Sequence, residues 1–217
     1  MRKITIILCL FLLTALTNKS SAAESQTAAQ EARQHANCGE WQQAIESYNK
    51  ALAKAPNDAV CLARRGYAYA RLGNYKQALA DFASAIKCDA NCPDAYSRRS
   101  RLYGWLGLTQ LAKQDATKTL ELTTSVPKEP DLLLEHAGTL QIVEKTKEAE
   151  AEYKQVLALN TPGKDLTTLL FADSAHAGLR QYKDSVYCIT QALKLAPDCF
   201  SLHLLRGRAY GNLKQWE

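Results

Sequence analysis

The chain has 217 residues, of which 47% are hydrophobic and 23% charged, and its formal net charge is +5. Ten Gly and six Pro are few, and no Pro falls inside an expected helix, which favours an all-helical chain. Arg2, Lys3 and Lys19 lie within residues 1–23 without any acid, so the remainder carries only +2, and charge alone gives no reason to expect nucleic acid as a partner.

Residues 1–23 have the pattern of a secretory signal peptide. Arg2-Lys3 precedes an apolar run over residues 4–16, and the small residues Ser21-Ala22-Ala23 stand before Glu24. The alternative is a membrane anchor, but the run is short against the roughly 20 residues that span a bilayer. We therefore expect cleavage after Ala23 and an exported chain, periplasmic or extracellular, with no stable membrane insertion.

A pattern of glycine, aromatic and alanine residues between Gly66 and Ile86 recurs along the rest of the chain. The segment GYAYARLGNYKQALADFASAI predicts two amphipathic helices joined by a tight turn at Gly73. Gly107 takes the place of Gly73 after 34 residues, and Gly39 takes it 34 residues before. A helical hairpin repeated at this period indicates a solenoid, in which each unit buries its second face only against its neighbours.

The predicted repeats follow one another in chain order from residue 24 onward. Residues 24–28 are expected to fray before a first helix that runs from about Ala29 to Cys38 and ends at Gly39, and a second helix follows over residues 41–53. The array over residues 24–217 then divides into repeats at about 25–58, 59–92, 93–126, 130–163 and 166–199, with a partial repeat over 200–217.

The later repeats depart from the pattern. The fourth has Glu144 to Lys147 at its turn in place of glycine, and the fifth has Ser185 where a small alanine is expected. The sixth begins at Phe200 and has no second helix before Glu217, so no polar helix covers its apolar face. We expect a fragment of a longer array; the alternative is that the last helix acts as an incomplete cap.

These segments carry a family resemblance. RRGYAYARLGNYKQALADFASAI is the strongest unit, and EWQQAIESYNKALAKAPND and RGRAYGNLKQW repeat its two halves. Over about residues 25–217 the chain resembles the tetratricopeptide repeat (TPR) family. The resemblance implies a right-handed α-solenoid whose concave groove is lined chiefly by the first helix of each repeat. It also implies a protein-binding scaffold rather than an enzyme.

Two arginines are predicted to hold the hairpins together. Arg65 and Arg99 occupy equivalent places in the first helices of repeats two and three, and Asp81 and Asp115 are equivalent in the second helices. Because partly buried charges are usually paired, we expect Arg65 and Arg99 to bind these aspartates and to fix the geometry between helices.

A second set of residues is predicted to line the groove. Guanidinium groups suit carboxylates and exposed aromatic rings supply apolar contact area. A groove over repeats one to three is therefore expected to bind an extended or helical peptide with acidic or C-terminal carboxylate groups; the alternative is an ordinary solvated face with scattered arginines. The family's Lys/Asn carboxylate clamp for chaperone tails is not present, which disfavours that ligand. The candidate residues are Arg33, Arg64, Tyr67, Arg98, Arg101 and Trp105.

Six cysteines remain after residue 23. Cys88 and Cys92 flank one turn between repeats, and Cys61 begins a helix that should run antiparallel to the one ending at Cys88. Cys61–Cys88 and Cys88–Cys92 are therefore competing candidates for a disulfide, and buried free thiols are the alternative.

No enzymatic motif is recognisable. There is no phosphate loop, nucleophile elbow or zinc-protease motif. His35 and Cys38 make only two ligands, and Asp89 to Asp94 lacks the glycine and distal glutamate of a calcium loop. No metal, cofactor or catalytic residue is predicted.

Two hypotheses for function remain. The first is an exported, non-catalytic scaffold that binds a peptide or protein segment in the groove. The second is the repeat portion of a longer protein whose missing C-terminal part carries the activity.

Overall fold

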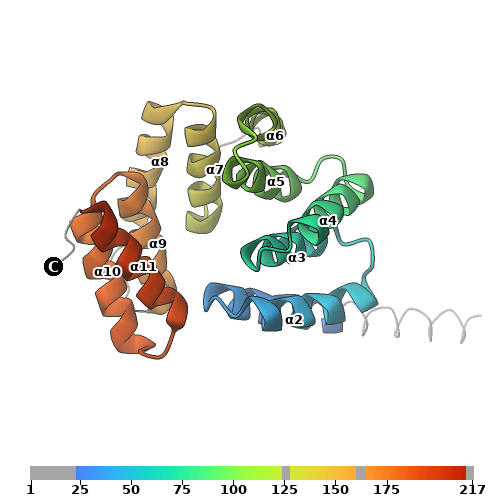
Figure 1. The fold of residues 1–217 in the computed structure, drawn as a ribbon, viewed down its shortest axis with the longest axis horizontal. Helices are drawn as coiled ribbons and strands as arrows, with labels where there is room; N and C mark the ends of the chain where they lie inside the picture. The colour runs from blue at the N-terminus through green and yellow to red at the C-terminus, as the bar shows by residue number, and fades with distance from the viewer. Residues whose placement is uncertain (1–22, 124–127, 160–164, 214–217) are drawn as a thin grey trace, which may run out of the picture. The chain divides into compact units, whose positions relative to one another are not determined.

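The computed structural model describes residues 23–123, 128–159 and 165–213, and within these ranges every regular element is an α-helix. The all-helical fold is confirmed. A first helix covers 23–37, and the others follow in pairs (Figure 1): α2 Trp41–Lys54, α3 Ala59–Arg71, α4 Tyr75–Cys88, α5 Pro93–Trp105, α6 Thr109–Leu122, α7 Pro130–Ile142, α8 Thr146–Leu159, α9 Leu166–Gly178, α10 Tyr182–Leu195 and α11 Phe200–Asn212.

Some sequence predictions fall outside these ranges. The signal peptide up to residue 22 and the pair Trp216-Glu217 lie outside the described residues. The expected fraying of residues 24–28 is wrong, because residues 23–37 are all helical. Ser25 is buried in this helix, and its hydroxyl donates a hydrogen bond to the Ala51 carbonyl oxygen at 3.1 Å.

The chain forms two compact units, Met1–Ala95 and Tyr96–Glu217. Within the first unit α2 packs on α3 and α3 on α4. Within the second unit each helix from α6 to α11 packs on the next, and α7 also touches α9. Contacts between successive helices are the pattern expected of stacked hairpins.

The turns inside the hairpins share one backbone conformation. Gly39, Gly73 and Gly107 have φ between 73° and 80°, the left-handed region in which glycine avoids the steric cost of a side chain. The fourth and fifth hairpins place Glu144 (φ 66°) and Arg180 (φ 59°) at the same point. A non-glycine residue therefore adopts the left-handed conformation in these two turns.

In each pair we call the first helix the A helix and the second the B helix. Position 1 of an A helix is the residue that aligns with Ala59, the first residue of α3, so that Gly66 is position 8. Position 1 of a B helix is the residue that aligns with Tyr75, the first residue of α4. The five B helices bury the same four positions, 4, 7, 8 and 11. In α4 these are Ala78, Asp81, Phe82 and Ala85. One repeating face thus supplies the core of every hairpin.

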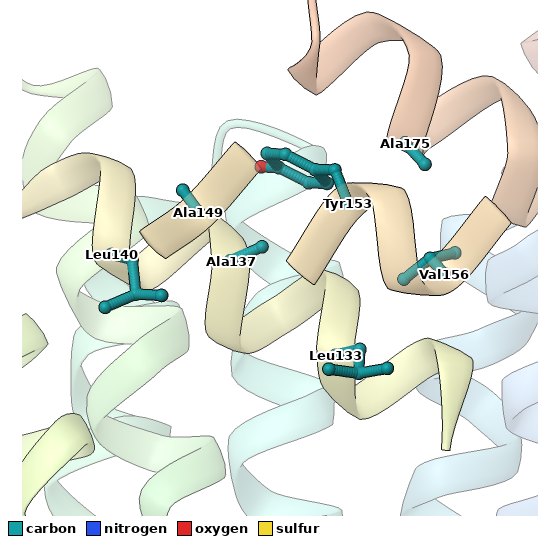
Figure 2. Packing of buried hydrophobic residues seen from close by; sticks show 7 residues of the cluster. All are labelled: Leu133, Ala137, Leu140, Ala149, Tyr153, Val156 and Ala175. Atoms are coloured by element: carbon teal, nitrogen blue, oxygen red, sulfur yellow. The ribbon is translucent and has the colours of Figure 1, made fainter. Parts of the chain in front are cut away.

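The core of the fourth hairpin shows how these faces meet. Figure 2 shows Leu133, Ala137 and Leu140 of α7 packed with Ala149, Tyr153 and Val156 of α8, and Ala175 of α9 joins them. Tyr153 is buried because a glycine makes room for it: a Cβ atom on Gly178 would lie 2.8 Å from Cδ2 of the ring and closer still to Cε2 and Cζ.

A position 8 lies against B position 4 in the second, third and fifth hairpins. In the second hairpin a Cβ atom on Gly66 would lie 3.1 Å from the carbonyl oxygen of Ala78. In the third, the Ser100 hydroxyl donates to the Ala112 carbonyl oxygen at 2.7 Å. In the fifth, both positions are polar, as described below.

Candidate functional site

The predicted pairing of Arg65 and Arg99 is confirmed. Arg65 donates from Nε and Nη2 to both carboxylate oxygens of Asp81, at 2.8 and 2.7 Å. Arg99 makes the same forked contact with Asp115, at 2.7 and 2.8 Å. The paired carboxylate raises the pKa of each arginine above its ordinary value. These four side chains join A position 7 to B position 7 and are committed to the fold.

The fourth hairpin replaces this pair with a histidine and a glutamate. His136 and Glu152 occupy the two positions, and Nδ1 of the imidazole lies 2.8 Å from each carboxylate oxygen. His136 was not predicted as a site residue. The spacing could have indicated its partner, because His136 and Glu152 are 16 residues apart, as Arg65 and Asp81 are.

The fifth hairpin holds a buried polar contact of another kind. Asp173 at A position 8 accepts a hydrogen bond from the Ser185 hydroxyl at B position 4, with 2.5 Å between Oδ1 and Oγ. Both side chains are buried. Burial raises the pKa of the Asp173 carboxyl, and the Ser185 hydrogen bond, Arg208 and His176 only partly offset this.

Two of the predicted groove arginines already bind carboxylates of the chain. Arg64 donates from Nε to Asp94 at 3.0 Å, within the first unit. Arg98 donates from Nη2 to Glu135 at 2.8 Å, within the second. Each pair links the A helices of adjacent repeats. Any ligand carboxylate at these arginines must therefore share or replace an internal partner.

A cluster of two aromatic rings and an arginine lies between α2 and α3. The Trp41 and Tyr67 rings meet edge to face with centroids 5.9 Å apart. The Arg71 guanidinium carbon lies 4.4 Å from the Trp41 ring centroid and 5.9 Å from that of Tyr67. Trp41 and Arg71 were not predicted as site residues; the signal for Arg71 was its place one turn after Tyr67 on the same helix face.

Arg33 and Arg64 lie close enough to act on one thiol. Both lower the pKa of Cys61, although burial dominates and raises it to about 12. Arg33 is exposed and Arg64 half-buried. Arg33 and the face of α3 that carries Arg64, Tyr67 and Arg71 thus present positive charge and an aromatic ring together. We call Arg33, Arg64, Tyr67, Arg71 and Trp41 the α3 surface.

The remaining predicted residues belong to the second unit. Trp105, the last residue of α5, is 48% exposed. Arg101 is half-buried and acts electrostatically on Tyr153, whose pKa burial raises to about 12.

The six cysteines of the described chain are free thiols in the structure. Cys61 and Cys92 are buried, whereas Cys88 is exposed and its sulfur lies 3.8 Å from Oδ1 of Asn57. Burial also raises the pKa of Cys92, and that of Cys188 to about 11. The disulfide among Cys61, Cys88 and Cys92 stays a prediction.

No group of three or more His, Cys, Asp or Glu side chains within the described ranges is arranged to hold a metal ion. The segment that resembles a calcium loop is a turn, in which the Asn91 amide donates to the Asp89 carboxylate at 2.9 Å before α5 begins.

Among the described helices, none is both long and apolar enough for a membrane span.

Comparison with known proteins agrees with this architecture. Residues 39–102 match the family model described as tetratricopeptide repeat. A solved TPR protein of Thermus thermophilus superposes with a TM-score of 0.54 at 18% identity, over 85% of this chain and 98% of its own. The fold is that of TPR proteins. A search of curated proteins found no match.

Smaller TPR domains resemble parts of the chain. The first TPR domain of Spaghetti (RPAP3), solved with an HSP90 peptide, covers 57% of this chain and 98% of its own, at 24% identity and a TM-score of 0.47. The TPR2B domain of yeast Sti1, solved with a Hsp70 peptide, covers 55% and 98%, at 21% identity and 0.46. At these scores the likeness does not extend to a binding mode.

Proposed function

We propose that the chain is an exported, non-catalytic scaffold for protein–protein interaction, and that the α3 surface binds an acidic peptide segment. The TPR fold and the family match over residues 39–102 support a scaffold. The observation that carries the site is the row Arg64, Tyr67 and Arg71 on one face of α3, next to Trp41. This row combines charge for a carboxylate with rings for apolar contact.

The internal pair at Arg64 is compatible with a ligand. The bond to Asp94 uses Nε, and the two terminal nitrogens of Arg64 make no hydrogen bond within the described residues. A bidentate carboxylate would engage these nitrogens while Asp94 keeps its own contact. Arg71 can leave the Trp41 ring at little cost, since it is exposed and a cation–π contact at an exposed site is worth only about 0.5–1 kcal/mol.

The test uses two fluorescein-labelled peptides of equal length, one rich in Asp, Glu and Leu and one with lysine in place of each acid. We expect the acidic peptide alone to bind in a fluorescence anisotropy titration. The double variant Arg33→Glu, Arg71→Glu should lower the affinity for the acidic peptide at least tenfold, which is about 1.4 kcal/mol. Binding should also weaken as salt rises, because exposed charges are screened.

The matched control is Lys76→Glu with Lys87→Glu, which changes net charge equally on the exposed face of α4. Equal loss in both double variants would show that only net charge matters and would contradict the α3 surface. Absence of binding by both peptides would contradict an acidic ligand.

Export is tested separately. When the gene is expressed with its full N-terminus in a secreting host, the protein recovered outside the cytoplasm should begin at Glu24 by N-terminal sequencing. A retained N-terminus in a membrane fraction would show an anchor instead.

A further inference from the structure

The peptide bond expected to be cut during export lies inside the first turn of a helix. Residues 23–37 are helical, so this bond joins Ala23 and Glu24, the first two helical residues of the described chain. The Thr27 hydroxyl donates a hydrogen bond to the Ala23 carbonyl oxygen at 3.0 Å, across one helical turn. The carbonyl group that a peptidase would attack is therefore part of the helix in the folded chain.

The two residues that follow this bond are held against α2. Ser25 is buried, and its hydroxyl donates to the Ala51 carbonyl oxygen at 3.1 Å. Glu24 pairs through Oε2 with Nζ of Lys54 at 2.8 Å. Farther along the same helix Ala32 is 0% exposed. The chain on the C-terminal side of the bond is thus docked from its first residue onward, with no linker before the fold.

A peptidase cannot bind a substrate in this arrangement. Its active site holds several residues on both sides of the cleaved bond in an extended conformation, whereas residues 23–37 are helical. The first turn would have to unwind and leave α2 before the peptidase could reach the Ala23 carbonyl group. Cleavage of the folded chain can therefore proceed only through local opening of the first helix.

We propose that docking of the first helix on α2 and cleavage after Ala23 compete. The chain is then processed before its first hairpin closes, and a chain that folds first keeps its N-terminal segment. Cleavage is a hydrolysis, in which water supplies the second oxygen of the new Ala23 carboxylate and the released Glu24 amino group takes up a proton. The proposal rests on the proposed export of the chain.

The position of the bond fits this order of events. Cleavage after Ala23 removes only the exposed contact of the Thr27 hydroxyl and keeps the contacts of Glu24 and Ser25 with α2. Cleavage one residue later would remove the ion pair, and cleavage two residues later would remove the buried hydroxyl as well. The bond after Ala23 is thus the last one whose cleavage leaves both contacts for the mature helix to dock with.

The test compares one precursor before and after it folds. The full chain, with its N-terminal segment, is purified in urea and diluted into detergent with a type I signal peptidase, which is added either at once or after refolding. Intact-mass spectrometry measures the initial rate of cleavage after Ala23. We expect the refolded chain to be cut about tenfold more slowly or less, because only its opened fraction is a substrate.

The two arms separate this proposal from the proposed export. Equal rates in both would overturn the competition and leave export standing. If neither sample is cut after Ala23, both the signal peptide and the competition are overturned.

A linker insertion tests docking without disturbing the fold. A flexible Gly/Ser segment between Ala23 and Glu24 moves the cleaved bond away from the helix and keeps the contacts of Glu24 and Ser25. Circular dichroism should be unchanged, and the refolded linker chain should be cut as fast as the freshly diluted one. A refolded linker chain that stays as slow as the refolded unchanged chain would overturn the proposal.

A pair of substitutions tests docking from within the helix. Ala32 lies more than two turns beyond the bond, and Ala32→Asp would place a charge at a fully buried position, which should release the helix and speed cleavage of the refolded chain. The matched control is Gln34→Asp, which puts the same side chain on the exposed face and should leave cleavage slow. Equal acceleration by both substitutions would show an effect of charge and would contradict protection by docking.

Discussion

Single residues decide how closely these helices approach. Gly66 and Gly178 each leave space that a neighbouring aromatic ring fills, Phe82 in the first case and Tyr153 in the second. Gly104 and Gly138 lie in helices too but have nothing within 4 Å. The role of a glycine in this chain therefore depends on its surroundings and not on the residue type.

Gly178→Ala should destabilise the second unit by about 2 kcal/mol, because the new methyl group overlaps the Tyr153 ring and the core must shift. Gly104→Ala, in open space on a helix, should be neutral or stabilise by up to about 1 kcal/mol. Urea unfolding followed by circular dichroism measures both. Equal effects of the two substitutions would contradict the packing argument.

Asp173 gives the stability a dependence on pH. Its pKa is raised from the ordinary 3.8 by burial, so between 3.8 and the raised value the folded state holds a proton that the unfolded state has lost. The contribution of Asp173 to the free energy of unfolding therefore falls as pH rises through that window. Above the window, the full cost of burying the charged carboxylate is present.

Asp173→Asn keeps an acceptor for Ser185 without the charge, so we expect it to be more stable than the unchanged chain at pH 7. The advantage should shrink below the raised pKa and disappear near pH 3.8. The measurement is the difference in urea midpoint between the two chains from pH 3.5 to 7.5, since other carboxylates cancel in it. A difference that grows toward acid would show the opposite shift.

At the scale of the element, each hairpin depends on one left-handed residue in its turn. Glycine fills this place in three hairpins, while Glu144 and Arg180 fill it at φ 66° and 59° in the other two. A side chain in this region costs about 1–2 kcal/mol, part of which the greater freedom of unfolded glycine offsets.

Arg180→Gly should therefore stabilise the second unit by about 0.5–1 kcal/mol, and Gly73→Ala should destabilise the first unit by a similar amount. Differential scanning calorimetry of the two variants gives the sign of each change. Arg180 is the better choice than Glu144, whose carboxylate also pairs with Lys113 at 2.7 Å. A loss of stability in Arg180→Gly would show that the arginine side chain contributes more than its backbone conformation costs.

The features that sequence could predict are those that repeat at a fixed register. The helices, the glycine turns and the Arg65–Asp81 pair all follow from periodic patterns within one hairpin. Arg64–Asp94 and Arg98–Glu135 could not be predicted this way, because they share no common register: the first joins A position 6 to position 2 across 30 residues, and the second joins position 6 to position 6 across 37. Ser185 was noted as a departure, but its partner Asp173 lies on another helix and belongs to no motif.

The first helix shows the same limit. Fraying was the expectation for residues 24–28, which are helical in the structure. The bond from Ser25 to the Ala51 carbonyl is a tertiary contact over 26 residues, which no local pattern indicates. A tertiary contact therefore stabilises this part of the helix.

For the molecule as a whole, the thiols report which parts are closed to solvent. Burial raises the pKa of Cys61 to about 12 and that of Cys188 to about 11, so at neutral pH both are almost entirely protonated and poor nucleophiles. Cys88, in contrast, is exposed to solvent.

In the reduced, folded chain we expect Cys88 to react first with a thiol reagent at pH 8, and Cys61, Cys92 and Cys188 to react only as the chain unfolds. Mass spectrometry of tryptic peptides after timed labelling identifies the order. The oxidised chain tests the predicted disulfide: protection of Cys88 that a reductant removes would indicate a bond to Cys61 or Cys92. Rapid labelling of Cys61 in the reduced chain would contradict the buried geometry.

The pairs at position 7 have a further consequence for how the chain avoids errors during folding. Similar hairpins in one chain can exchange partners, an A helix closing on the B helix of another repeat. Position 7 is Arg–Asp in the second and third hairpins, His–Glu in the fourth and Ala172–Cys188 in the fifth. Closing α3 on α10 would leave Arg65 opposite a thiol, with a half-buried charge unpaired. The second, third and fourth hairpins could trade partners without that penalty, because each places a basic side chain opposite a carboxylate at position 7. Among hairpins two to five, mispaired species, where they form, should therefore be drawn from these three and not from the fifth.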